Sequence, residues 1–376
     1  MEEKVLYRKK LQDLVSRKIG YGVVQPGDNV NGGIPVIKVR DIVAGLPSRE
    51  TLDCTTPEIE SAYSRTRLHG GEIVLSIVGT IGKTCIVPPE FKGSNLVRAT
   101  ALIDIANPTI SKWVKYYIDS PVGQNYIQGN LNTTVQPTLN IKTLAEMEIP
   151  FYQQEYMEKA VCIMSAIEEK IKLNNRINHN LDEQADAIIA SLFEENDCVS
   201  ALKDMAYYVN DKTATTSFSI ADYISTENMN PDKSGIGLAS NLPDGRATSF
   251  RKGDTLVSNI RPYFKKIWNA SRDGICSNDI LCFRSSNNTP STLYHLLRQD
   301  SFFDYVMTGA KGSKMPRGDK DQIMKWNIPS ISVLCRFEKE LAALDAKVIA
   351  LTYENMILTE QRDSLLPMLM SGEITC

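Results

Sequence analysis

Long apolar runs, a signal-like segment and clustered metal ligands are all missing from this chain of 376 residues. No run of about 18 apolar residues occurs, so the sequence predicts no transmembrane helix. The charged start, Met1-Glu2-Glu3-Lys4, is not followed by an apolar stretch, which argues against a secretory signal and leads us to expect a cytoplasmic protein. The eight cysteines lie far apart without a C-x-x-C pair, so we expect free thiols in a reducing compartment and no metal site.

Signatures of catalysis are also missing. The chain has only three histidines, His69, His179 and His295, and the sequence offers none of them an obvious partner for a catalytic triad or a zinc site. It contains neither the G-x-G-x-x-G pattern of dinucleotide sites nor an Asn-Pro-Pro-Tyr motif of amino-methyltransferases. We therefore expect a binding protein with no catalytic residues of its own.

One segment mimics a phosphate-binding loop. Gly82-Lys83-Thr84 follows an apolar strand-like stretch, but the P-loop pattern requires glycine at position 77, where the chain has Ile77. The continuation Cys85-Ile86-Val87 reads as a strand, whereas phosphate binding needs the N-terminus of a helix. A nucleotide-binding enzyme built on this turn stays open as a less favoured alternative.

Charge is distributed in alternating blocks along the chain. Residues 1–150 carry 17 Lys and Arg against 15 Asp and Glu, a net charge of +2, and residues 199–329 carry 17 against 13, a net charge of +4. Residues 151–198 carry 4 against 10 and residues 330–376 carry 4 against 7, so their net charges are −6 and −3. Because nucleic-acid affinity depends on local charge, the overall net charge of −3 does not exclude a DNA-binding protein.

The chain repeats itself at an offset that drifts from 182 to 177 residues, as small loop deletions would produce. The matched pairs are Gly71–Ser76 with Gly253–Ser258, Lys83 with Lys265, Ala101–Ile103 with Leu281–Phe283, Gln136-Pro137 with Met315-Pro316, Ile149-Pro150 with Ile328-Pro329, and Leu181–Gln184 with Leu358–Gln361. Two tandem copies of one unit of about 180 residues follow from this spacing.

Each copy begins with strand-like segments and continues with a helical one. In the first copy the predicted strands are Ile34–Val39, Ile73–Val78, Thr84–Val87 and Ala99–Ile105. A single helical segment is expected next, at Ile110–Ile127 in the first copy and at Thr292–Met307 in the second. Strands followed by helices within each copy predict an α+β fold.

Both copies end in a long helix with coiled-coil spacing. Apolar residues recur at alternating steps of three and four from Ala160 to Leu192 and from Phe337 to Leu369. Neither stripe can be buried alone, so we expect the two helices to pack antiparallel and to relate the copies by a pseudo-two-fold axis. Asn178 and Asn355 are polar seam positions of the kind that set register, and the second helix is expected to end or kink near Pro367.

Basic and polar residues gather in the loops of both copies, with Tyr263 and Phe264 interleaved in the second. Such side chains contact phosphates, and Arg, Asn and Gln can also read base edges. The candidate DNA-binding residues are Thr80, Lys83, Arg98, Thr134 and Gln136 in the first copy and Asn259, Arg261, Lys265, Lys266, Lys311, Lys314 and Arg317 in the second. Two similar basic faces suit a DNA target with two separated half-sites.

The set of motifs resembles the DNA-specificity subunit of type I restriction–modification systems. The resemblance extends over about residues 10–372 and rests on the duplicated motifs in their order. The segments that carry it are Leu75–Lys83, Ser258–Lys266, Gly312–Asp319 and Asn174–Asn178 before Leu181.

The resemblance implies an architecture and a set of partners. It implies target-recognition domain 1 at residues 1–150, a first spacer helix at 151–198, target-recognition domain 2 at 199–329 and a second spacer helix at 330–376. Each domain would read one half of a bipartite double-stranded DNA sequence, while two methyltransferase subunits dock on the chain. The partner methyltransferase would use S-adenosylmethionine on adenine N6, and a restriction subunit, where one exists, would use ATP and Mg²⁺; the chain itself would hold no cofactor.

A different class of function also stays open. A coiled-coil adaptor that links two protein partners without DNA would show the same helical spacing. A salt-dependent mobility shift separates the two, because phosphate contacts give binding a steep dependence on salt.

Overall fold

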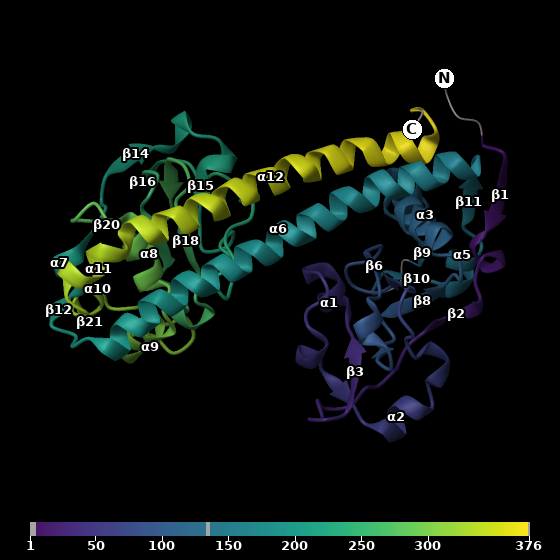
Figure 1. Cartoon of the computed structure of the whole chain (residues 1–376), viewed down its shortest axis with the longest axis horizontal. Coiled ribbons are helices and arrows are strands. Elements are labelled where there is room, and N and C mark those ends of the chain that lie inside the picture. Colours follow the sequence, from purple (N-terminus) through teal and green to yellow (C-terminus); the bar gives the residue numbers. More distant parts are fainter. Residues whose placement is uncertain (1–4, 133–135, 375–376) are drawn as a thin grey trace. The chain divides into compact units, whose positions relative to one another are not determined.

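The computed structural model describes residues 5–132 and 136–374 and divides the chain into two compact units (Figure 1). Unit 1 comprises the described residues of Met1–Ile171 and Ile357–Cys376, and unit 2 comprises Lys172–Met356. The boundary runs through both long helices, α6 (Gln154–Glu195) and α12 (Glu338–Ser371), so each helix contributes one part to each unit.

Unit 1 contains two sheets and two short strand pairs. A four-stranded sheet has the order β2-β8-β5-β6, a three-stranded sheet has the order β4-β3-β7, and β1 pairs with β11 as β9 pairs with β10. The strands are β1 (Tyr7–Lys10), β2 (Arg17–Tyr21), β3 (Ile34–Ile37), β4 (Cys54–Thr55), β5 (Ile73–Ser76), β6 (Thr84–Ile86), β7 (Asn95–Leu96), β8 (Thr100–Asp104), β9 (Leu131–Asn132), β10 (Thr138–Leu139) and β11 (Glu148–Phe151). The four strands predicted from the sequence are confirmed as β3, β5, β6 and β8.

Unit 2 repeats the central four-stranded sheet of unit 1. Its four-stranded sheet has the order β13-β20-β17-β18, a second sheet has the order β14-β16-β19-β15, and β12 pairs with β21. The strands are β12 (Ser200–Ala201), β13 (Ala206–Tyr208), β14 (Lys212–Ala214), β15 (Tyr223–Ile224), β16 (Arg246–Phe250), β17 (Thr255–Ser258), β18 (Ile267–Asn269), β19 (Gly274–Cys276), β20 (Ile280–Ser285) and β21 (Asn327–Ile328). The central sheets correspond strand by strand, which confirms the internal repeat and the α+β class.

The helical segment expected in each copy consists of two consecutive helices in the structure. In unit 1 the chain breaks at Ser120, whose extended backbone caps the next helix while its hydroxyl accepts from the Gly123 N–H at 3.3 Å. Pro121 follows at a position where its missing N–H costs nothing. In unit 2 the break falls at Gln299, which is also extended. The helices besides α6 and α12 are α1 (Val39–Ala44), α2 (Pro57–Ser61), α3 (Pro108–Asp119), α4 (Pro121–Gly129), α5 (Ile141–Ala145), α7 (Leu202–Met205), α8 (Pro290–Leu297), α9 (Asp300–Thr308), α10 (Lys320–Ile323) and α11 (Ile331–Leu334).

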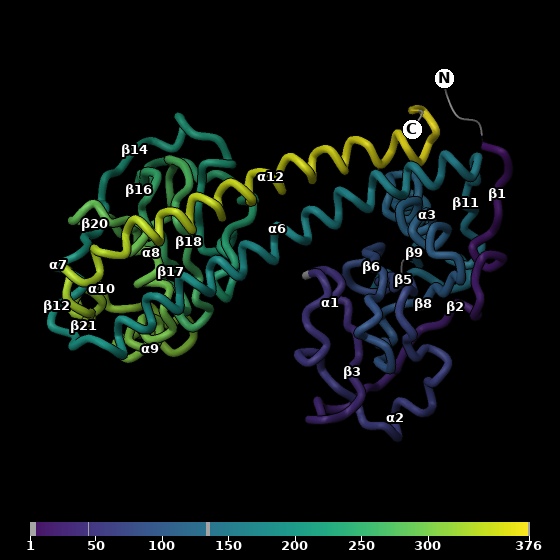
Figure 2. The backbone as a smooth tube through the Cα atoms, in the orientation of Figure 1, coloured from purple at the N-terminus to yellow at the C-terminus, as the bar shows by residue number. Residues whose placement is uncertain are grey.

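Within unit 2 the two long helices lie side by side and antiparallel (Figure 2). The Asn174 amide donates to Asn355 Oδ1 at 2.9 Å, and one turn further along α6 the Asn178 amide donates to Thr352 Oγ1 at 3.3 Å. Partner numbers fall along α12 as they rise along α6, and Leu341 of α12 shares a core cluster with Ala185 and other residues of α6. The predicted coiled-coil pairing is therefore confirmed, with Asn174 as the fully buried polar position.

Within unit 1 the same two helices join the core in the same antiparallel sense. The Tyr156 hydroxyl donates to the Leu369 carbonyl at 2.8 Å, and the Tyr152 hydroxyl donates to the Met370 carbonyl at 3.1 Å. These bonds satisfy carbonyls of the last helical turn, and Leu369 and Met370 are buried. Helix α12 thus includes Pro367 and ends four residues later, at Ser371. Over the described ranges, no helix combines the length and apolar composition of a membrane span.

A buried carboxylate precedes the central strand of each sheet at matching repeat positions. Glu72 before β5 accepts from Arg17 at 2.7 Å and from the backbone N–H of His69 at 2.6 Å. Asp254 before β17 accepts twice from Arg284, both at 2.7 Å, and from the backbone N–H of Arg251 at 2.8 Å. A charge-assisted pair at this point ties the strand to its neighbours and sets where the following turns lie.

Candidate functional site

A pinned turn follows the central strand of unit 1. Strand β5 ends at Ser76, which is paired with Thr100 at the start of β8. The Ser76 hydroxyl donates to the Thr80 carbonyl at 2.6 Å and accepts from the Lys83 N–H at 2.9 Å. Because these bonds hold the turn from inside, Thr80 and Lys83 are left exposed at the end of the sheet.

Other predicted residues of unit 1 lie at the same end of this sheet. Arg98 precedes β8, and the Ile77 N–H donates to the carbonyl of the next residue, Ala99, at 2.8 Å. Gln136 precedes Thr138, which forms a bridge to Val78 of the turn. Arg98 and Gln136 are both exposed, and Thr134 lies outside the described residues.

The turn does not have the geometry of a P-loop. Thr84 begins strand β6 and is paired with Leu75 in an antiparallel hairpin. Its hydroxyl donates to Asp119 Oδ1 at 2.6 Å. In a P-loop the hydroxyl at this position binds a metal ion, whereas here it is already hydrogen-bonded within the protein. A strand follows Lys83 where phosphate binding needs a helix N-terminus, so the nucleotide-enzyme alternative loses its structural basis.

Unit 2 places a basic turn at the corresponding end of its sheet. Strand β17 ends at Ser258, and the next residue, Asn259, donates its N–H to the Asp279 carbonyl at 2.8 Å. The Arg261 N–H donates to the Pro316 carbonyl at 2.8 Å, which joins the turn to a second loop. That loop is closed by two backbone bonds of 2.9 Å between Lys311 and Arg317.

The structure thus brings together candidates that lie about fifty residues apart in the sequence. Lys314, at the tip of the second loop, is exposed and has no ion pair within the part of the chain that the structure describes. Lys83 and Arg98 of unit 1 share this property. These three cations are the ones most available to a phosphate.

Several other candidate cations already have protein partners. Lys311 Nζ lies 2.7 Å from Asp319 Oδ2, Arg317 lies 3.2 Å from Asp279 Oδ1, and Lys265 Nζ lies 3.0 Å from Asp300 Oδ1. The hydrogen bond from Lys311 lowers the pKa of Asp319, and bonds from Lys233 and Lys265 lower the pKa of Asp300.

Two further candidates are held inside the protein. Lys266 donates to the Thr226 carbonyl at 2.7 Å, and burial lowers the pKa of this lysine. The Asn259 side chain is only 9% exposed, and its Oδ1 lacks a hydrogen-bond partner. These two side chains are placed to support the turn rather than to present a surface.

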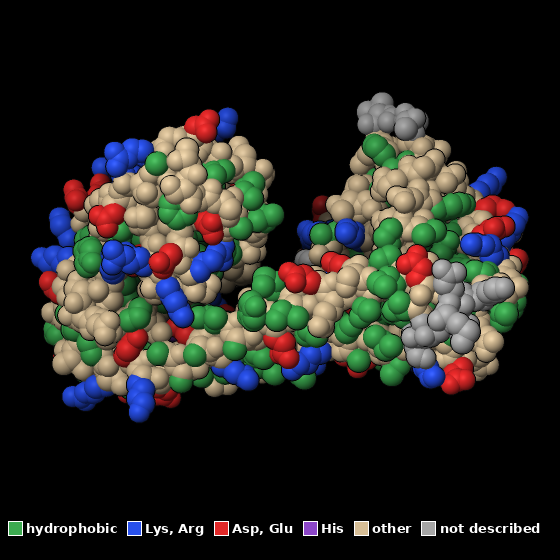
Figure 3. Space-filling model, turned by 90° about the horizontal axis from the view of Figure 1, so that it is seen from above, with side chains coloured by type: hydrophobic (Ala, Val, Ile, Leu, Met, Phe, Trp, Pro, Cys, Tyr) green, Lys and Arg blue, Asp and Glu red, His purple; other side chains and the backbone are tan. Residues whose placement is uncertain are grey.

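The charged surface of unit 2 is mixed. On the face drawn in Figure 3, its Lys and Arg side chains are interspersed with Asp and Glu and do not form one continuous basic patch.

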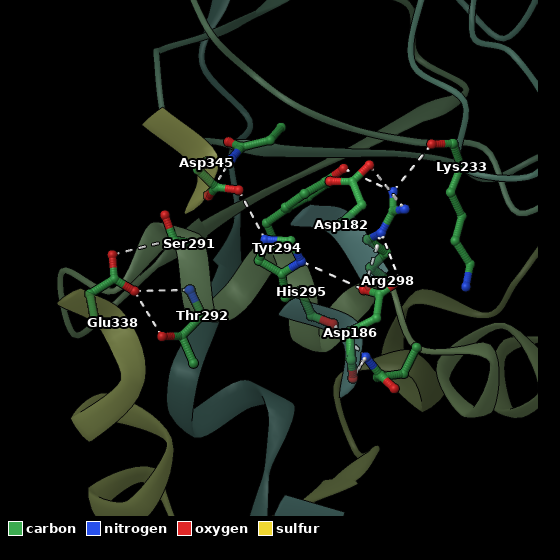
Figure 4. Close-up of polar contacts among 12 residues, drawn as sticks. Asp182, Asp186, Lys233, Ser291, Thr292, Tyr294, His295, Arg298, Glu338 and Asp345 are labelled. Atoms are coloured by element: carbon green, nitrogen blue, oxygen red, sulfur yellow. Dashed lines mark hydrogen bonds and ion pairs between the residues drawn. The ribbon is translucent and has the colours of Figure 1, made fainter. Parts of the chain in front are cut away.

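The sequence reading missed a buried charge cluster in unit 2 (Figure 4). His295 of α8 has two carboxylate partners that the sequence did not reveal. Its Nε2 lies 2.9 Å from Asp345 Oδ1 of α12, and its Nδ1 lies 3.6 Å from Asp186 Oδ1 of α6. Arg298 completes the cluster at 3.0 Å from Asp186 and 3.2 Å from Asp182. His295, Arg298 and Asp345 are buried, and their ion pairs anchor α8 to the long helices.

Two copies of one α+β fold, each presenting a pinned basic turn at the same end of the same strand pair, define a class of tandem binding proteins. Comparison with known proteins gives the family. Residues 8–183 match the family described as "Type I restriction modification DNA specificity domain". The resemblance seen in the sequence is thereby confirmed over this range.

Individual relatives agree with the family match. The chain is 32% identical over 146 residues to the type I restriction enzyme EcoBI specificity subunit of Escherichia coli, a match that covers 39% of this chain and 31% of that protein. The crystal structure of a type I restriction-modification system S subunit from M. genitalium shares its fold with a TM-score of 0.55 and 14% identity, covering 96% of this chain and 95% of that one.

Proposed function

We propose that this chain is the DNA sequence-specificity subunit of a type I restriction–modification complex, and that its two units read the two halves of a bipartite target. The observation that carries the proposal is the repeated placement of the basic turns after β5 and β17, in a chain whose residues 8–183 match the specificity-domain family. DNA half-sites read by two related modules are a common design in sequence recognition.

Partners supply the chemistry in this proposal. Two methyltransferase subunits dock on the chain, bind S-adenosylmethionine and methylate adenine N6 in each half-site. Restriction subunits, in complexes that cut DNA, bring ATP and Mg²⁺. The chain contributes recognition and assembly and needs no cofactor, in keeping with the missing catalytic motifs of its sequence.

An adenine-methylation map of the source cells, made with and without this gene, tests the proposal. We expect a bipartite motif to lose its methylation when the gene is removed and to regain it when the gene is restored. The complex of chain and methyltransferase should bind a duplex that carries this motif, with an affinity that falls steeply as salt rises. A map that stays unchanged without the gene, or binding that ignores salt, contradicts the proposal and favours a protein adaptor.

A further inference from the structure

Two aromatic rings are exposed at the tip of the turn after β17. Tyr263 is 47% and Phe264 is 38% exposed, and their ring centroids lie 4.7 Å apart. They sit on a 3₁₀ turn, Pro262–Phe264, whose flanking residues Arg261 and Lys265 both adopt left-handed backbone angles with φ of 50°. This conformation is unfavourable for residues with side chains and persists only where the surroundings enforce it.

The turn is held on both flanks by backbone hydrogen bonds. Arg261 N–H donates to the Pro316 carbonyl at 2.8 Å on one side. On the other side, the Asp232 N–H donates to the Phe264 carbonyl at 2.9 Å and the Lys233 N–H donates to the Lys265 carbonyl at 3.0 Å. Backbone bonds on both flanks fix the direction of the rings, so their exposure does not result from a loose loop.

A side-chain clamp adds to these backbone bonds. Asp300 at the start of α9 accepts from Lys233 at 2.7 Å and from Lys265 at 3.0 Å, so it joins the Lys265 flank of the turn to the neighbouring loop. Exposed apolar rings do not stabilise the folded state, because apolar surface stabilises a protein only where it is buried away from water. Preorganised exposed aromatics are typical of binding hot spots.

The surroundings of the rings select the kind of partner. Lys266 Nζ lies 5.9 Å from the Phe264 ring centroid, and Met315, 44% exposed, stands in the neighbouring loop. Basic residues outnumber acidic ones among those that form the turn and its bonded neighbours. The basic residues are Lys233, Arg261, Lys265, Lys266, Lys311, Lys314 and Arg317, and the acidic ones are Asp232, Asp279, Asp300 and Asp319. Apolar rings in such a setting suit a polyanion with flat apolar faces.

We propose that the Tyr263–Phe264 pair inserts between, or stacks on, bases of duplex DNA at one step of the half-site that unit 2 reads. This inference rests on the proposed function and names the contact through which unit 2 would act. Apolar wedges that unstack a base step are an established mode of duplex binding, and base–aromatic stacking contributes strongly to affinity.

The two units differ at this point. The corresponding turn of unit 1, Gly79-Thr80-Ile81-Gly82, carries no aromatic ring and has side chains at only two of its four residues. Unit 1 therefore offers no such wedge in its turn, and the two half-sites are expected to be deformed unequally. Unstacking by unit 2 would favour a flexible base step at a defined position of its half-site.

The test compares ring-removing variants on a duplex that carries the motif found by the methylation map. The double variant Tyr263→Leu/Phe264→Leu keeps apolar side chains and loses both rings, while Tyr263→Phe keeps the ring and serves as the conservative match. Tyr353→Leu removes a ring that is 59% exposed on α12 instead of on the turn. Binding is measured with the chain in complex with its methyltransferase, and a thermal melt checks that each variant folds.

We expect the double variant to bind roughly 10- to 100-fold more weakly, from the usual effect of removing stacking on one or two bases. Its salt slope should stay unchanged, because no phosphate contact is lost. Tyr263→Phe and Tyr353→Leu should bind as the wild type does. Thymines of one half-site should become reactive to permanganate with the wild type and stay protected with the double variant.

Three outcomes overturn the inference. The first is a double variant that binds within twofold of the wild type with the same thymine reactivity. The second is a lower salt slope, which would assign the loss to phosphate contacts. The third is normal DNA binding with lost assembly of the methyltransferase, which would make the ring pair a protein interface. Failure of the wild-type complex to prefer the mapped duplex is distinct from these, since it contradicts the proposed function itself.

Discussion

His295 Nε2 lies 2.9 Å from Asp345 Oδ1, and the two side chains are 1% and 10% exposed. The other ring nitrogen faces Asp186 at 3.6 Å, so one imidazole on α8 is bound to carboxylates from both α6 and α12 (Figure 4). Asp345 also accepts from Asn269 of β18 at 3.0 Å. A single titratable ring thus ties the sheet and helix α8 of unit 2 to its two long helices.

This arrangement predicts a pH-dependent stability of unit 2. Burial lowers the pKa of His295, but Asp186 and Asp345 raise it, and the net direction is upward from 6.5. A raised folded pKa means that protonation stabilises the fold, fully below about pH 6.5 and decreasingly as the pH rises through the folded value. His295→Gln should lower the free energy of unfolding by roughly 1.5–3 kcal/mol at about pH 6, the usual range for a hydrogen bond to a charged group.

Denaturant unfolding of wild type and His295→Gln at matched pH values from about 6 to 9 checks this prediction, and the difference should shrink as the pH rises. His179→Gln is the matched control, since His179 is an exposed residue of α6 that meets only Glu183 at 3.2 Å. A difference that does not change with pH would mean that the ring acts through packing alone.

The basic turns predict separable effects on the two half-sites. Replacing Lys83 and Arg98 by Ala should weaken recognition of one half-site only, and replacing Lys314 and Arg317 should weaken the other only. Each lost phosphate contact should lower the slope of log affinity against log salt by about one. Mobility shifts at several salt concentrations and a methylation map of each variant provide the measurements.

Exposed lysines at the other ends of the same sheets supply controls for these variants. Lys92 lies beyond the far end of β6, and Lys252 precedes β17. Lys92→Ala and Lys252→Ala should leave the slope and the motif unchanged. If the two sets of turn variants altered preference at the same base positions, the division of the target between two units would be wrong.

The polar seam of unit 2 predicts coupled effects on stability. Asn174 is fully buried and donates to Glu354 Oε2 at 2.7 Å and to Asn355 Oδ1 at 2.9 Å. Asn174→Leu removes both of these hydrogen bonds and Asn355→Leu removes one of them, so each single variant should cost about 0.5–3 kcal/mol in urea unfolding. The double variant removes both groups and should lose less than the sum, because apolar pairs suit a helix seam. Strictly additive losses would show that the two amides do not act as a pair.

The missing catalytic motifs predict an inactive isolated chain. The purified protein should neither methylate nor cleave DNA, and it should direct methylation once its methyltransferase partner is added. Transfer of labelled methyl groups from S-adenosylmethionine, measured with and without the partner, tests this. Activity of the chain alone, in a preparation shown to be free of methyltransferase, would disprove the recognition-only role.

Much of the fold could be predicted from local sequence patterns. Strands β3, β5, β6 and β8 are short runs of β-branched and other apolar residues between turn-forming residues, and such a pattern is readable without tertiary context. The long seam of α6 is equally local, because each apolar position depends on neighbours three or four residues away. The break at Ser120 was missed although Pro121 marks it, since the apolar pattern continues on both sides.

Contacts between residues far apart in the sequence could not be predicted from these local patterns. Pro367 predicts a helix end or kink by local rules, and nothing local shows that the Tyr152 and Tyr156 hydroxyls, more than 200 residues earlier, donate to carbonyls of the last helical turn. His295 finds its partner 50 residues later in Asp345, and nothing in the spacing of either residue marks the pair. The candidate Lys and Arg residues were chosen by residue type. Whether each one is available to bind a phosphate depends on whether it already forms an ion pair with Asp or Glu in the folded chain.

The sequence by itself determined the tandem repeat, the α+β class, the two long helices and the loops where basic residues gather, because periodicity and motif order are encoded by near neighbours. Only the tertiary structure decided that the turns after β5 and β17 lie at matching ends of the two sheets. It also decided that Lys83, Arg98 and Lys314 are free of ion pairs among the described residues. The outward position of Tyr263 and Phe264 likewise follows only from the tertiary structure. The reason is physical: a hydrogen bond or ion pair between residues far apart in sequence depends on the packing of the whole unit, and a local pattern holds no record of it.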